Sequence, residues 1–143
     1  MSQRWADVSH AFEPDGALLE LHVFDTDLGA WRRVFDAIAG LPVCYTGDGV
    51  EVAPPRSVDE AFELRCTQNL LQQIYLGRLK VHCHFFDESE IEFDLDPAEY
   101  RGQAELDALV AFMRRVADAS GRQCVLTFEG GDPYRIFSVR PGG

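Results

Sequence analysis

Apolar and polar residues alternate along much of the chain, and the period of alternation predicts which segments are strands. In the segment 79–85 every second residue is apolar, and the segment 90–96 repeats this pattern. A period of two places all the apolar side chains of a strand on one face. We therefore expect two strands that share one buried face. The polar residues 87–89 separate them, which predicts a hairpin.

Shorter runs of the same kind predict the other strands. A strand is expected within 17–24, where Glu20 and His22 alternate with leucine and valine. Two short pieces within 42–53 flank Asp48-Gly49, a pair that favours a tight hairpin turn. The runs 123–129 and 134–139 flank Gly130-Gly131 and predict a last hairpin.

Two segments have the helical period instead. In 28–38 the apolar residues recur every three or four positions, after Thr26 or Asp27, either of which can cap a helix. In 103–120 the same period continues over five turns, and Gly121 follows where a glycine often ends a helix. Both segments are expected to be amphipathic helices.

The segment 57–76 allows two interpretations. Ser57 with Glu60 has the spacing of a capping box, which favours a helix. Phe62, Leu64 and Cys66 alternate, which favours a strand that would continue the pattern of the next segment. We favour two strands on either side of residues 67–69.

Together these elements predict an α+β fold. We expect an antiparallel or mixed sheet of six to eight strands, built from hairpins, with the two amphipathic helices packed on one face. A chain of 143 residues is long enough to bury one ordinary core without a disulfide or structural metal. Residues 1–16 lack a clear period and are interpreted as an N-terminal arm, and 17–140 as a single domain.

Charge excludes several classes of partner. The chain has 24 acidic and 13 basic residues, for a net charge of −11. Nucleic acids and anionic membranes are bound by clustered lysine and arginine, so neither is an expected partner. The chain has no run of 18 apolar residues, its start does not resemble a signal peptide, and its four cysteines form no C-x-x-C pair. These features predict a cytoplasmic protein with reduced thiols.

The hairpin 78–96 is the segment in which residue types and geometry point to a site. If the two apolar faces coincide and the turn is 87–89, Phe86 lies opposite Glu90. The outer face then carries a ladder of three pairs: His84 with Glu92, His82 with Asp94 and Lys80 with Asp96. Such a ladder can simply fix the register of the two strands. Alternatively, His82 and His84, two residues apart on one strand, bind Zn or another divalent metal together with Glu92 or Asp94.

Catalysis by cysteine is not expected. Cys83 lies between His82 and His84 in the sequence, but neighbours on a strand point to opposite faces. We therefore expect Cys83 to be buried, with a raised pKa, away from both imidazoles. The chain also lacks the motifs of phosphate loops, serine hydrolases and zinc proteases. The sequence thus favours a protein that is not an enzyme.

The segment 87–99 holds seven acidic residues and no basic one, which makes it the main candidate for a binding surface. The leading hypothesis is a non-catalytic interaction module that binds a basic protein partner, such as an immunity-type inhibitor of a toxin. The partner-binding residues would be Asp87, Glu88, Glu90, Glu92 and Asp94. Two alternatives remain: a metal-binding protein or metal-dependent enzyme that uses His82 and His84, and a homodimer formed through an uncovered sheet face.

Overall fold

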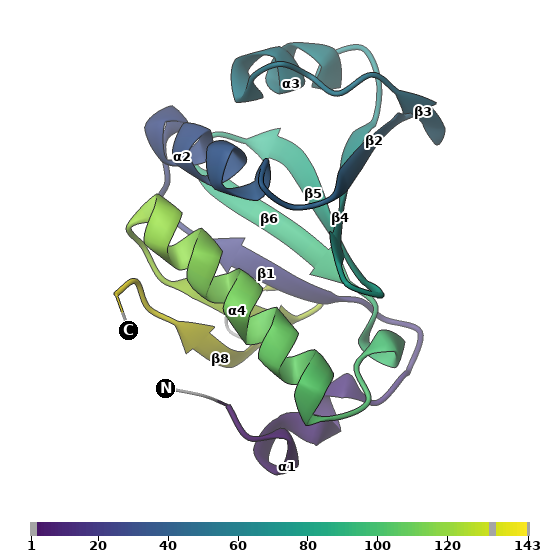
Figure 1. Cartoon of the computed structure of the whole chain (residues 1–143), viewed down its shortest axis with the longest axis vertical. Coiled ribbons are helices and arrows are strands. Elements are labelled where there is room, and N and C mark those ends of the chain that lie inside the picture. Colours follow the sequence, from purple (N-terminus) through teal and green to yellow (C-terminus); the bar gives the residue numbers. More distant parts are fainter. Residues whose placement is uncertain (1–2, 132–133, 143) are drawn as a thin grey trace.

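Within the part of the chain that the structure describes, eight antiparallel strands form one sheet, and the longer helices cover one side of it (Figure 1). The computed structural model describes residues 3–131 and 134–142. The strands, in the order in which they lie in the sheet, are β3 (Val50–Val52), β2 (Val43–Gly47), β4 (Leu70–Leu76), β5 (Leu79–Asp87), β6 (Glu90–Leu95), β1 (Leu19–Val23), β7 (Cys124–Phe128) and β8 (Arg135–Val139). The helices are α1 (Trp5–Val8), η1 (Ser9–Phe12), α2 (Leu28–Ile38), α3 (Val58–Arg65), η2 (Pro97–Glu99) and α4 (Gln103–Ser120). The predicted α+β class is confirmed, and every strand pair is antiparallel.

Most element boundaries follow from local sequence signals. Asp27 caps α2, because its Oδ1 accepts a hydrogen bond of 2.8 Å from the Ala30 amide. Gly121 ends α4 with a φ of 72°, a conformation that glycine adopts at little cost. Asp48 and Gly49 both have positive φ and form the two-residue turn between β2 and β3. These elements lie where the sequence predicts them.

Segment 57–76 differs from the prediction in its first half. It forms the helix α3 followed by the single strand β4, and not two strands. The capping interaction decides the outcome: Ser57 Oγ accepts a hydrogen bond from the Glu60 amide, and Glu60 Oε1 accepts one from the Arg56 amide. The alternation of Phe62, Leu64 and Cys66 was therefore a misleading signal.

Replacing Ser57 with alanine is expected to lower the free energy of unfolding by about 1 kcal/mol, because the Glu60 amide loses its partner at the start of α3. Urea denaturation would measure this difference. Thr67 also bonds to the backbone of this region, but at the end of α3, through its hydroxyl to the Leu64 carbonyl. A Thr67→Ala control should cost less. An unchanged midpoint for Ser57→Ala would show that the cap does not hold the helix.

The core lies between the sheet and the helices, and aromatic rings join the layers. Trp31 of α2 stacks on Phe85 of β5, with ring centroids 5.6 Å apart, and Phe62 of α3 meets both rings edge-on. Phe112 of α4 packs edge-on against Phe93 of β6, at 5.3 Å. These contacts place α2, α3 and α4 on one face of the sheet, one helix more than the sequence predicts.

The N-terminal segment packs against the rest of the chain. Val8 and Phe12 are buried, and the Phe12 ring lies 5.4 Å from that of Tyr100, beyond the end of β6. The Trp5 amide donates a hydrogen bond to Gln103 at the start of α4. These contacts connect the short helices α1 and η1 to the domain.

Within residues 3–131 and 134–142, no helix combines the length and the apolar character that crossing a membrane requires.

Candidate functional site on the open face of the sheet

The face of the sheet opposite α2, α3 and α4 carries titratable residues on three neighbouring strands. We call it the open face, and define it by Glu20 and His22 of β1, His82 and His84 of β5, and Glu90, Glu92 and Asp94 of β6. Their apolar neighbours in sequence point into the core on the other side. The predicted direction of the side chains in the hairpin 79–95 is therefore confirmed.

The register of the hairpin matches the prediction in its middle and differs at its ends. His84 lies opposite Glu92, and His82 lies opposite Asp94, as expected. At the turn, however, Asp87 and not Phe86 lies opposite Glu90. The register of β5 shifts by one residue between His84 and Asp87. This shift offsets a turn that is one residue shorter than predicted, so the pairs in the middle of the hairpin still match the prediction.

The third predicted pair, Lys80 with Asp96, does not form. The strand β6 ends at Leu95, and Asp96 instead caps η2 by accepting a hydrogen bond from the Ala98 amide. Lys80 lies opposite Tyr75 on the other neighbouring strand, β4. The predicted ladder thus has two pairs.

Asp94 is shared by both imidazoles of β5. Its Oδ1 lies 3.3 Å from His82 Nδ1, and its Oδ2 accepts a hydrogen bond from His84 Nε2. Burial acts to raise the pKa of Asp94, but the bonds from His82 and His84 outweigh burial and lower that pKa to about 2. His84 therefore bonds diagonally to Asp94 and not to Glu92, which lies directly opposite.

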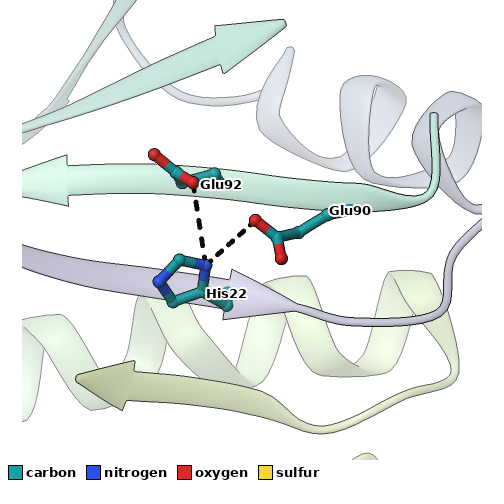
Figure 2. Close-up of side chains that lie close together, drawn as sticks. All are labelled: His22, Glu90 and Glu92. Atoms are coloured by element: carbon teal, nitrogen blue, oxygen red, sulfur yellow. Dashed lines mark hydrogen bonds and ion pairs between the residues drawn. The ribbon is translucent and has the colours of Figure 1, made fainter. Parts of the chain in front are cut away.

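Glu92 turns the other way, toward His22 of β1 (Figure 2). His22 Nδ1 lies 3.2 Å from Glu90 Oε2 and 3.8 Å from Glu92 Oε1, and Nε2 lies 3.1 Å from Glu20 Oε1. Only 4% of His22 is exposed. One buried imidazole thus has three carboxylates around it, and we call these four residues the His22 cluster.

Two features hold the His22 ring in place. The ring of Phe24 stacks on it, with centroids 5.1 Å apart and planes within 8°. Gly131, which follows β7, lies against it, and an added Cβ there would lie 3.5 Å from Nε2. A cavity of about 390 Å³ lies beside the cluster and is lined by Glu20, His22, Phe24, Glu90, Glu92, Gly130 and Gly131.

The carboxylates of the cluster repel one another. Burial raises the pKa of Glu92, and the negative charge of Glu20 raises it further, while His22 acts in the opposite direction. Ionising Glu92 therefore costs more free energy in the folded protein than in the unfolded chain. The cluster has a local excess of negative charge.

The set of metal ligands inferred from the sequence is divided between two places. His82, His84 and Asp94 lie together between β5 and β6, whereas Glu92 belongs to the His22 cluster between β6 and β1. Sequence reasoning assigned no site role to Glu20 and His22. The available signal was a pair of titratable residues on an otherwise apolar strand, but nothing in the sequence showed that this strand pairs with β6.

The acidic segment 87–99 is also divided. Asp87 and Glu88 are exposed at the turn between β5 and β6, and Glu90, Glu92 and Asp94 are half-buried on the open face. The last two acids, Asp96 and Glu99, lie at the opposite end of β6. Of the five residues predicted to bind a partner, two therefore lie at the turn and three lie on the open face, whereas the other two acids are separate from them.

Cys83 lies on the core side, as the alternation predicts. It is buried, and burial raises the pKa of its thiol well above the ordinary value, with smaller contributions from the charges of Asp94 and Glu92. A thiol in this state is a poor nucleophile.

Comparisons with known proteins identify no relative: no protein-family model, curated protein or solved structure matches this chain.

Proposed function

We propose that this protein is a non-catalytic interaction module that binds a basic protein partner through the open face and the adjacent turn. The observation that supports this proposal is the arrangement of the layers. The helices α2, α3 and α4 pack on one side of the sheet, while carboxylates of β1 and β6 gather on the other. Clustered carboxylates attract a basic surface and orient it before contact.

An aromatic side chain beside the acids gives this surface an anchor. Phe86 is 51% exposed, and its ring stacks on His84 with centroids 4.8 Å apart. Asp87 and Glu88 follow it in the turn. Protein interfaces commonly combine a central aromatic residue with a charged rim. In this proposal Phe86 supplies the apolar contact, and the acids supply selectivity for a cationic partner.

An immunity-type inhibitor of a nuclease is one protein of the proposed class. A nuclease binds phosphates with a basic surface, and carboxylates at suitable spacing occupy the positions of those phosphates. Cytoplasmic location is part of the same proposal, since an inhibitor of this kind acts where the nucleic acid is.

The test compares two variants that each lose three negative charges. The first carries Asp87→Asn, Glu88→Gln and Glu90→Gln; the control carries Asp36→Asn, Glu63→Gln and Asp107→Asn, three exposed acids on the helices. We expect the wild type and the control to capture a basic protein from the source cell. The turn variant should bind that protein about 10-fold more weakly, because it loses the attraction between opposite charges.

Salt provides an independent measurement on the same pair. Raising the salt concentration from 50 to 500 mM should weaken wild-type binding by at least about 10-fold, since attraction between exposed charges is screened. A captured protein that is acidic, or one that binds the turn variant and the control equally well, would contradict the proposal.

A further inference from the structure

The His22 cluster has the composition of a metal site and not of a simple ion pair. An ordinary pair joins one acid to one base, whereas Glu20, Glu90 and Glu92 all form their ion pairs with the same imidazole. With all three carboxylates ionised, even a protonated His22 would leave a net charge of −2 on these four residues. A divalent cation would neutralise that excess.

The two ring nitrogens of His22 face different partners, and this asymmetry matches the way in which proteins prepare a histidine ligand. With the proton on Nε2, the ring donates a hydrogen bond to Glu20 Oε1, at 3.1 Å. The lone pair of Nδ1 then points toward Glu90 and Glu92. A carboxylate that accepts from the far nitrogen fixes the tautomer and the orientation of metal-binding histidines.

The three inner groups lie close to the spacing that one ion requires. One ligand atom from each of His22, Glu90 and Glu92 lies within 4.8 Å of the others, a spacing that a small movement of the glutamates would close. Phe24 and Gly131 restrict the ring from two sides. The adjoining cavity provides room for water to complete the coordination shell.

We propose that His22, Glu90 and Glu92 bind a divalent first-row transition-metal ion such as Zn²⁺, with Glu20 as the residue that orients the His22 ring. One imidazole with two carboxylates suits Zn²⁺ or Mn²⁺ better than Ca²⁺, which prefers six or more oxygen ligands. This proposal does not depend on a basic partner, and it assigns the ion to the β1–β6 pair and not to His82 and His84.

The first experiment titrates chelator-treated protein with Zn²⁺, Mn²⁺ or Ca²⁺ in a calorimeter. We expect one Zn²⁺ per chain and Ca²⁺ binding at least about 10-fold weaker. His22→Gln and Glu92→Gln should each weaken Zn²⁺ binding about 100-fold or more, and Glu20→Gln about 10-fold, since it only orients the ring. Absence of saturable Zn²⁺ binding by the wild type would overturn the proposal.

Two controls identify the site. His10→Ala removes a histidine of η1 outside the cluster, and the double variant His82→Ala/His84→Ala removes both imidazoles of β5. Each should bind Zn²⁺ as the wild type does. Loss of binding in the β5 variant, with binding retained in His22→Gln, would overturn the assignment in favour of Asp94 and its histidines.

The melting temperature provides a second measurement that does not rely on any one variant being fully stable. Zn²⁺ should raise the melting temperature of the wild type and of the controls, because the ion binds only the folded state. It should raise the melting temperature of Glu92→Gln much less, because this variant keeps the size of the side chain but binds the ion more weakly. An equal rise in Glu92→Gln and the wild type would contradict the proposal.

Discussion

Replacing Trp31 with alanine is expected to lower the free energy of unfolding by about 3–5 kcal/mol. Trp31 is 1% exposed and lies where α2, α3 and the sheet meet. Its ring contacts both Phe62 and Phe85. Alanine would leave a cavity that three separate elements have to fill, and such cavities close only in part.

Trp31 also connects the core to the turn of the β5–β6 hairpin. Its Nε1–H donates a hydrogen bond of 3.0 Å to the Asp87 carbonyl. The alanine variant would therefore also loosen the backbone beside the proposed partner surface. Guanidinium denaturation would measure the loss of stability. Trp5→Ala, which removes a half-buried tryptophan from α1, is the matched control and should cost clearly less.

A variant of Trp31 that keeps an aromatic ring separates packing from the hydrogen bond. Trp31→Phe should recover most of the stability lost in Trp31→Ala, since the contacts with Phe62 and Phe85 carry most of the effect. Equal losses in the two variants would show that the hydrogen bond to Asp87 dominates instead.

Replacing Asp94 with asparagine is expected to lower the free energy of unfolding at pH 6 by about 2–3 kcal/mol. This value follows from the pKa of Asp94, which falls from an ordinary 3.8 to about 2 in the folded protein. Each unit of difference in pKa between the folded and unfolded states corresponds to about 1.4 kcal/mol of stability. The physical cause is the pair of imidazoles that both contact this carboxylate. The variant removes the negative charge and keeps the shape.

The pH dependence has a definite sign. Because the folded-state pKa lies below the unfolded value, the contribution of Asp94 is fully present above pH 4 and is lost as pH falls through about 2. The difference between wild type and Asp94→Asn should therefore shrink between pH 5 and pH 2. Asp36→Asn, an exposed acid on α2, is the control and should show little difference at any pH. A constant difference for Asp94→Asn across this range would contradict the assignment.

The sequence alone predicted the parts of this fold that depend on local signals. The caps at Asp27 and Gly121 and the turn at Asp48-Gly49 involve residues within a few positions of one another. Gly121 and the turn lie where expected, and Asp27 is one of the two residues expected to cap α2. The alternation of the 79–95 hairpin also predicted which side chains reach the open face. Each of these features depends on the period of a single segment or on one turn.

The remaining features depend on contacts between distant segments. The helix α3 was misassigned because the alternation of apolar residues was weighed above the capping box at Ser57. The local signals allowed both structures, and the contacts of Phe62 with Trp31 and Phe85, which fix its place in the core, come from distant segments. The His22 cluster was missed for the same reason, since β1 and β6 pair although about 70 residues separate them in sequence. The predicted hairpin correctly placed Glu92 and Asp94 on the open face but could not show which neighbour each would contact.

The position of β1 also has a consequence for how the protein folds. The strands β4, β5 and β6 follow one another in sequence and can pair as successive hairpins, whereas β1 must enter between β6 and β7 from the start of the chain. Closing such a long loop is slow compared with closing a hairpin. We expect the sheet to form first as two separate parts that β1 joins in a late step, so that His22 reaches Glu90 and Glu92 of β6 only when folding is nearly complete.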